Sequence, residues 1–120
     1  MTFDSTATGT FVIAPTPFLP DGGLDLVSAA RMTEAYLKMG ATGLTILGIM
    51  GEAPKLDAAE STAFVKAVLS ANAGQVPVVV GVSSPGFAAM RALSHEVMEA
   101  GAAGVMIAPT PGLKGDDAVI

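Results

Sequence analysis

The segment GIMGEAPKL, which begins at Gly48, has the residue types and spacing of a loop that binds a ligand. Gly48 and Gly51 permit positive φ and close backbone approach, so that amide groups can be presented to a ligand. Glu52 follows them, either as a general base or as a carboxylate that caps backbone N–H groups or favours the positive end of the following helix. Between the glycines stand Ile49 and Met50. This pair predicts either an apolar pocket wall or side chains that pack beneath the loop.

Hydroxyl groups recur after the apolar runs of the sequence. IAPTP occurs twice, which places Thr16 and Thr110 in the same setting, each as a candidate ligand contact or a turn-stabilising hydroxyl. Ser83 and Ser84 follow another apolar run, and we expect them to cap the next helix. Neither serine lies in a Gly-x-Ser-x-Gly elbow, so the sequence does not predict a serine nucleophile.

Cysteine and histidine chemistry is limited. The chain has no cysteine, which excludes thiol catalysis, and its one histidine, His95, is too few for a zinc site. His95 is placed on the helix face opposite Met90 and Leu93, with Arg91 and Glu99 four residues to either side. We therefore expect an exposed histidine and no bound metal.

The composition is that of a folded domain. Of 120 residues, 51% are apolar and 14% are charged, which excludes a disordered chain. The net charge of −5 and the lack of tryptophan argue against nucleic-acid binding. No apolar run approaches the roughly 18 residues of a membrane span, and the first residues do not form a signal peptide. We expect a cytoplasmic protein that binds neither nucleic acid nor membranes.

Short apolar runs alternate with amphipathic stretches along the chain. The apolar runs predict strands, buried on both faces, at 10–18, 43–48, 76–83 and 104–109. The stretches between them predict helices at 25–39, 57–72 and 86–100.

The helices carry expected buried faces and caps. The buried faces are Leu26, Ala30, Thr33 and Leu37, then Phe64, Val65, Val68 and Leu69, then Met90, Leu93 and Val97. Asp25 and Asp57 are the expected N-caps, and Asp57 forms a capping box with Glu60. The expected C-caps are Gly40, Gly74 and Gly101.

Alternating strands and helices with short loops predict a parallel sheet with right-handed crossovers. MGATGLTIL and AGAAGVMIA lie 61 residues apart and share a helix end, a turn and a strand start. The repeat spans two strand–helix units of about 30 residues each, and eight such units make about 250 residues, the usual length of a (β/α)₈ barrel. A flavodoxin-like open sheet has similar units, and the period alone does not distinguish the two folds.

The last residues, KGDDAVI, predict the start of a fourth helix, capped by Asp116 or Asp117 and cut after one turn. Four strands also leave two open edges and no closed barrel core. We therefore expect residues 1–120 to be the N-terminal half of one barrel domain.

The order of several short motifs resembles the dihydrodipicolinate synthase / N-acetylneuraminate lyase family, from Gly9 to about Asp116. The motifs are TPF followed by DG at residues 16–22, the Gly-x-x-Gly-Glu loop with its later Leu56 and Glu60, and VPVVVGVS.

The resemblance implies a (β/α)₈ barrel, in homodimers or homotetramers, whose active site lies at the carboxyl ends of the strands. It implies a class I aldolase or lyase that binds pyruvate or another 2-keto acid as a Schiff base, without a metal or organic cofactor. The Schiff-base lysine would lie on the sixth strand, beyond Ile120. The substrate-binding residues it suggests here are Thr16, Gly48, Ile49, Met50, Gly51, Glu52 and Thr110.

Two positions depart from the family pattern. Ile49 and Met50 stand where family members usually have two hydroxylic residues that bind the keto-acid carboxylate. APTPGLKG, residues 108–115, stands where the family usually has Pro-Tyr-Tyr, and the one tyrosine, Tyr36, is expected to pack on the first helix. We therefore expect an aldolase or lyase with an apolar substrate loop. The alternatives are an inactive ligand-binding barrel, or a fragment without activity of its own.

Overall fold

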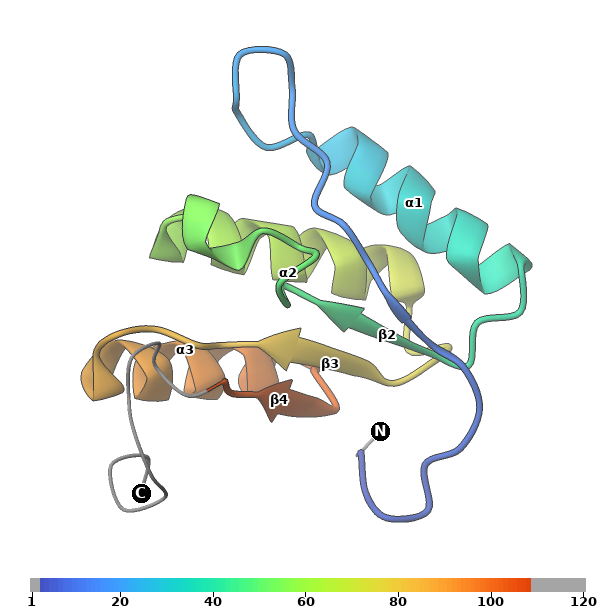
Figure 1. The fold of residues 1–120 in the computed structure, drawn as a ribbon. Coiled ribbons are helices and arrows are strands. Elements are labelled where there is room, and N and C mark those ends of the chain that lie inside the picture. The colour runs from blue at the N-terminus through green and yellow to red at the C-terminus, as the bar shows by residue number, and fades with distance from the viewer. Residues whose placement is uncertain (1–2, 109–120) are drawn as a thin grey trace.

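The computed structural model describes residues 3–108. Strands and helices alternate along the chain in the expected order (Figure 1). They are β1 (Phe11–Ile13), α1 (Leu26–Lys38), β2 (Gly43–Ile46), the 3₁₀ turn η1 (Ala53–Lys55), α2 (Ala58–Asn72), β3 (Val78–Gly81), α3 (Phe87–Ala100) and β4 (Gly104–Met106). None of the helices in these residues is long and apolar enough to cross a membrane.

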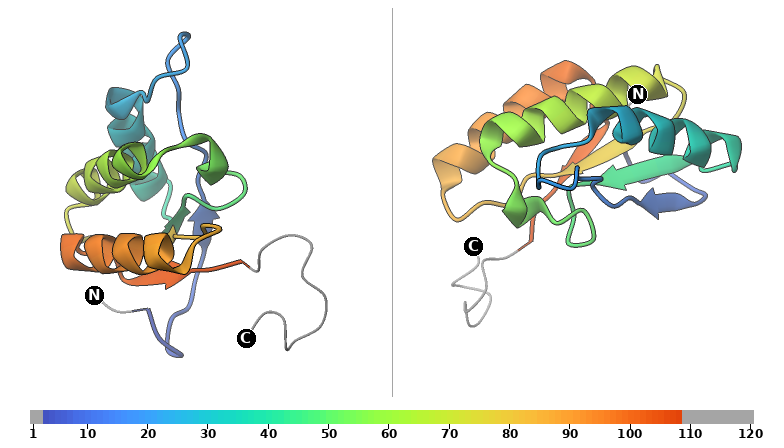
Figure 2. Two further views of the ribbon diagram at one scale, coloured as in Figure 1. Left: turned by 90° about the vertical axis from the view of Figure 1, so that its left-hand side faces the viewer. Right: turned by 90° about the horizontal axis from the view of Figure 1, so that it is seen from above.

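The four strands form one parallel sheet in sequential order, β1-β2-β3-β4. The three helices lie side by side on one face of this sheet, as the view from above shows (Figure 2). A flavodoxin-like sheet has a strand order that reverses and helices on both faces. The sequential order with helices on one face is the arrangement of a (β/α)₈ barrel wall.

The core lies between the sheet and the helices. Alternate strand residues point into it and are almost completely buried: Leu44, Ile46, Val78 and Val80. The expected face of α2 meets them, since Phe64, Val65 and Val68 are at most 1% exposed. Full burial of each such side chain contributes about 1.5–3 kcal/mol, so α2 and the two central strands form the centre of the domain.

Helix α1 buries a face that overlaps the expected one only in part. Ala29 and Thr33 are buried, and Met32 and Tyr36 pack against the core. Thr33 belongs to the expected stripe, whereas Leu26 is 40% exposed, so the predicted face is only partly correct. Among the neighbouring elements, the helix contacts α2 most. Thr33 tolerates burial because its hydroxyl donates to the Ala29 carbonyl at 2.9 Å.

The N-termini of α1 and α2 are capped as the sequence predicts. The Asp25 carboxylate accepts hydrogen bonds from the amide and hydroxyl of Ser28, and these bonds lower the pKa of Asp25. Asp57 and Glu60 form the expected capping box. Gly101 ends α3 with φ +116°, as expected. The C-caps of α1 and α2 are Met39 and Ala73, each one residue before the expected Gly40 and Gly74.

The strands are shorter than expected. The sequence predicts a first strand over 10–18, but β1 ends at Ile13. Beyond it, Phe18 and Leu24 form an isolated antiparallel bridge. Within residues 3–108, no helix covers the face of the sheet opposite α1, α2 and α3. This face carries a hollow with a mainly apolar lining. The residues that line it include Phe3, Phe11, Thr45, Val79 and Met106.

Asn72 supplies a stability test of the α2–β3 turn. It is 3% exposed, its side-chain amide donates to the Val76 carbonyl at 2.8 Å, and its side-chain oxygen accepts from the Val76 amide at 3.2 Å. We expect Asn72→Ala to lower the free energy of unfolding by about 1–3 kcal/mol, because both Val76 groups lose their partner.

The measurement is urea denaturation of the full-length protein. Ser70→Ala, exposed on the same helix, is the control and should change the unfolding free energy by less than about 0.5 kcal/mol. Equal effects of the two substitutions would contradict this account of the turn.

Candidate ligand-binding site

The candidate site is built on the turn that follows β2. Leu47 turns the chain with φ +56°, a left-handed conformation that costs a leucine about 1–2 kcal/mol. Its side chain is 3% exposed and belongs to the core. The burial of this side chain offsets the backbone strain, so the loop starts from a fixed point at the carboxyl end of β2.

Two glycines, Gly81 and Gly51, leave space for this turn. The positive φ that the sequence allowed for Gly48 and Gly51 is not adopted. A Cβ atom on Gly81, at the end of β3, would lie 2.1 Å from the Leu47 carbonyl oxygen. A Cβ atom on Gly51 would lie 2.9 Å from both the Leu47 Cα and the Leu47 nitrogen. Backbone atoms cannot rotate away as a side chain can, so each position requires glycine for the turn to keep its place.

Thr16 connects the loop to β1. Its side chain is 5% exposed, and its hydroxyl donates a hydrogen bond of 2.6 Å to the Gly51 carbonyl. The turn-stabilising role that the sequence allowed for Thr16 is therefore present. Direct contact of Thr16 with a ligand stays a prediction.

Some backbone amides of the loop form hydrogen bonds inside it, and others do not. The Gly51 amide donates to the Gly48 carbonyl at 3.1 Å, and the Glu52 amide donates to the Ile49 carbonyl at 3.0 Å. Within residues 3–108, no acceptor receives a hydrogen bond from the amides of Ile49 or Met50. Two consecutive amides at the carboxyl end of a strand can bind a carboxylate, since hydrogen bonds to an ionised acceptor are the strong ones.

The side chains of Ile49 and Met50 are 91% and 63% exposed. The alternative in which they pack beneath the loop is therefore wrong, and the neighbouring side chain that enters the core is that of Leu47. Other apolar side chains are exposed at the carboxyl ends of β1 and β4, namely Ile13, Met106 and Ile107. Met106 approaches the loop, with its Cε 3.3 Å from where a Cβ on Gly48 would lie.

Glu52 has a left-handed backbone, with φ +54°, and precedes η1. Its carboxylate pairs with the Lys55 ammonium group at 2.5 Å, and both side chains are partly exposed. It makes no cap hydrogen bond to η1, so the expected capping role is not seen. Exposed pairs of this kind contribute about 0–1 kcal/mol, and the role of Glu52 as a general base stays a prediction.

The serines after β3 have a different role from the one expected. The residue that precedes α3 is Gly86, which makes no side-chain cap, so the prediction that Ser83 or Ser84 caps this helix is wrong. Instead the Ser83 hydroxyl accepts a hydrogen bond of 2.8 Å from the Ala108 amide, which joins the ends of β3 and β4. Residues 83 and 108 are distant in sequence, and no local pattern indicates this contact.

The remaining candidates lie away from the loop. His95 is exposed, as expected, with its Nε2 3.1 Å from the Glu99 carboxylate on the same helix. Thr110 lies outside the described residues. Among the residues that are described, no three His, Asp or Glu side chains gather as a metal ligand set would.

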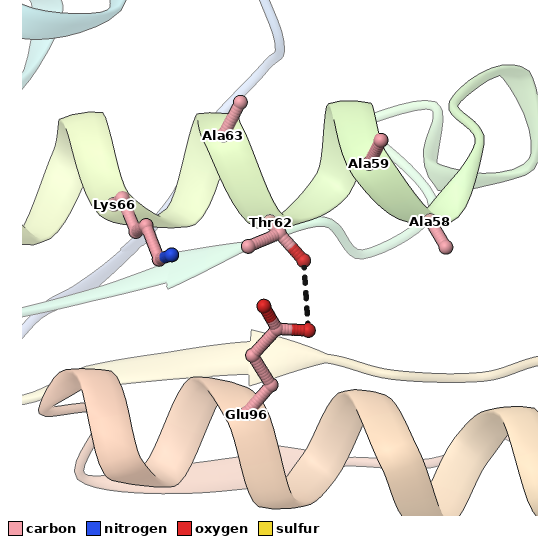
Figure 3. A pocket seen from close by; sticks show the side chains of 6 residues that line it. All are labelled: Ala58, Ala59, Thr62, Ala63, Lys66 and Glu96. Carbon is pink, nitrogen blue, oxygen red and sulfur yellow. Dashed lines mark hydrogen bonds between the residues drawn. The ribbon is translucent and has the colours of Figure 1, made fainter.

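A pocket between α2 and α3 offers less chemistry. It is lined by small residues of α2, with Lys66 and Glu96 at its sides (Figure 3). The Thr62 hydroxyl donates to Glu96 at 3.2 Å, from one helix to the other. This contact joins the two helices on the outer layer of the fold, so we assign the pocket a packing role.

Known proteins resemble this chain over nearly its whole length. Residues 6–111 match the Dihydrodipicolinate synthetase family. A 4-hydroxy-tetrahydrodipicolinate synthase from Sorangium cellulosum is 41% identical over 100 residues, which is 82% of this chain and 33% of the relative. The chain thus spans about a third of the length of that relative.

Solved structures of dihydrodipicolinate synthase family proteins are also similar to this chain. A dihydrodipicolinate synthase from Rhodopseudomonas palustris is 53% identical with a TM-score of 0.92, over 99% of this chain and 39% of that one. YagE of Escherichia coli K12, solved in complex with pyruvate, is 31% identical with a TM-score of 0.83, over 93% of this chain and 38% of that one. These matches confirm the predicted fold class, part of a (β/α)₈ barrel.

The exposure of the loop side chains gives a stability prediction. We expect Ile49→Thr with Met50→Thr to leave the free energy of unfolding within about 0.5 kcal/mol of the wild-type value, because little apolar surface is lost from the core. Leu47→Ala, the buried neighbour, should lower it by about 2–5 kcal/mol.

Urea denaturation of the full-length protein measures both changes. A loss of more than about 2 kcal/mol in the double variant would show that these side chains are packed after all.

Proposed function

The chain belongs to the dihydrodipicolinate synthetase family, and on that basis we propose that its full-length protein is a class I aldolase or lyase for 2-keto acids. In this proposal, pyruvate or a related keto acid forms a Schiff base with a lysine of a later strand. The described residues supply the group that binds the keto-acid carboxylate. The observation that carries the proposal is the fixed loop at the carboxyl end of β2, in which the amides of Ile49 and Met50 have no acceptor within residues 3–108.

The loop would bind the carboxylate through its backbone. Amide N–H groups of Ile49 and Met50 donate to the carboxylate oxygens, while hydroxyl donors are missing from both side chains. A hydrogen bond to a charged group is worth about 1.5–3 kcal/mol, so the loss of one such donor weakens keto-acid binding about tenfold or more.

The exposed side chains would select the rest of the substrate. Ile49 and Met50 lie beside the carboxylate donors, and the apolar Met106 approaches the same loop. A substrate whose distal part is apolar would bury these side chains and recover about 25 cal/mol per Å² of apolar surface. We therefore propose a keto-acid substrate, or a partner aldehyde, with an apolar group beyond the reacting carbon.

A second candidate is a barrel that binds the ligand without turnover. It is favoured by Tyr36, the chain's one tyrosine, which packs against the core and is not available for a proton relay. Ligand-dependent stabilisation without product would distinguish it from the enzyme. The 120-residue chain by itself should lack activity in either case, because barrels draw catalytic groups from several strands.

The wider setting follows from the same proposal. We place the full-length protein in the cytoplasm as a homodimer or homotetramer, acting on a small molecule without a metal or organic cofactor. The exposed apolar side chains of the described residues support assembly, among them Phe87 at 81% and Met39 at 74%.

Trapping of the Schiff base tests the proposed chemistry. The lysine nitrogen bonds to the keto carbon with loss of water, and borohydride reduces the resulting imine to a stable secondary amine. We expect full-length protein treated with pyruvate and borohydride to carry one keto-acid adduct per chain by mass spectrometry, on a lysine of a later strand.

Protein treated with borohydride alone is the control and should keep its mass. The absence of an adduct with pyruvate and with longer 2-keto acids would reject the aldolase chemistry.

The loop substitutions test substrate choice. We expect Ile49→Thr with Met50→Thr to lower the half-saturating pyruvate concentration for trapping by about tenfold, because hydroxyl donors join the amides. The preference for keto acids with an apolar chain should fall. Val27→Thr, an exposed position on α1, is the control and should change neither value. An unchanged preference in the double variant would contradict the apolar pocket wall.

A further inference from the structure

The loop that presents the Ile49 and Met50 amides is placed by contacts with both strands beside β2. Strand β2 pairs with β1 on one side and with β3 on the other. One contact from each neighbour reaches the loop, through Thr16 after β1 and through Gly81 at the end of β3. Both contacts end on loop backbone, so they act on the amides whichever side chains the loop carries.

Gly81 is needed for space and not for its own conformation. Its φ lies outside the left-handed range, so the backbone there would accept any residue. An added Cβ would lie 2.1 Å from the Leu47 oxygen, 2.7 Å from the Leu47 carbonyl carbon and 3.3 Å from the Gly48 nitrogen. All three atoms are backbone, and the first two are closer than any normal contact.

Relief of this contact would displace the loop. Leu47 already has a left-handed φ of +56°, and its side chain is 3% exposed in the core. The leucine cannot shift inward, so a side chain at position 81 must push the Leu47 carbonyl away from β3. The next two amides along the chain after Gly48, those of Ile49 and Met50, would move with it.

Thr16 fixes the other end of the same loop. Its hydroxyl donates to the Gly51 carbonyl at 2.6 Å, and the threonine is 5% exposed. Without this bond the Gly51 carbonyl loses its one side-chain donor in the described structure. The loop would then be held from the β3 side alone.

We propose that Gly81 and Thr16 are positioning residues for ligand binding, which together set the place of the Ile49 and Met50 amides. This inference rests on the proposed function, in which those amides bind a keto-acid carboxylate. Gly81 makes no contact with the carboxylate in this account and acts only through Leu47.

The test compares three variants of the full-length protein, Gly81→Ala, Thr16→Val and the control Gly86→Ala. Gly86 matches Gly81 as a non-left-handed glycine, but nothing lies within 4 Å of an added Cβ there. Hydrogen exchange of the peptide that spans residues 47–56 reports loop order without any ligand. Borohydride trapping over a range of pyruvate concentrations reports binding, as half-saturation, separately from chemistry, as the maximum trapped fraction.

We expect faster exchange in the loop peptide for Gly81→Ala and Thr16→Val, with exchange of the α2 peptides unchanged. The half-saturating pyruvate concentration should rise about tenfold in both, because the carboxylate loses well-placed donors while the lysine is untouched. The maximum trapped fraction should equal that of wild type. Gly86→Ala should match wild type in every measurement.

The proposal is overturned if Gly81→Ala folds and matches Gly86→Ala in loop exchange and half-saturation. If Gly81→Ala does not fold, Thr16→Val decides, and weaker pyruvate binding with unchanged loop exchange would mean direct contact and overturn positioning. If wild type forms no adduct, the proposed function fails. Loop exchange in the variants then still decides whether these residues fix the loop.

Discussion

The packing of the Leu47 carbonyl against the backbone of β3 at Gly81 is the constraint on which the candidate site depends. It brings together a strained turn, a buried leucine side chain and a strand end that has no room for a Cβ atom. The strain of about 1–2 kcal/mol is comparable with the gain of about 1.5–3 kcal/mol from burying the leucine. The loop is thus part of the core at its start, and its conformation does not depend on the side chains of Ile49 and Met50.

This arrangement separates the position of the loop from its chemistry. Glycines, a threonine hydroxyl and core packing set where the backbone donors lie. The two residues at the tip can then change from hydroxylic to apolar with little effect on the fold, since they are exposed. A family that uses one barrel for several substrates can vary such positions, because ligand binding at the carboxyl ends of the strands is largely independent of the helix-covered core.

The sequence predicted the parts of the structure that depend on local patterns. These include the alternation of strands and helices, the N-caps Asp25 and Asp57, and the buried face of α2. Local patterns could not show that Thr16 reaches Gly51 or that Ser83 reaches Ala108, because these partners are 35 and 25 residues apart. The buried stripe of α1 was predicted only in part, at Thr33, because the rest of it depends on how the helix packs against α2. Gly81 was visible only as a glycine at a strand end, and its contact with Leu47 needs the three-dimensional structure.

A crystal structure of the full-length protein with pyruvate bound tests most directly whether the loop backbone binds the substrate. The account predicts that the carboxylate oxygens lie about 2.7–3.2 Å from the Ile49 and Met50 nitrogens, the usual range for such hydrogen bonds. Leu47 should keep its positive φ and its contact with Gly81. A carboxylate bound elsewhere in the barrel, with those two amides bonded to other protein groups, would contradict the account.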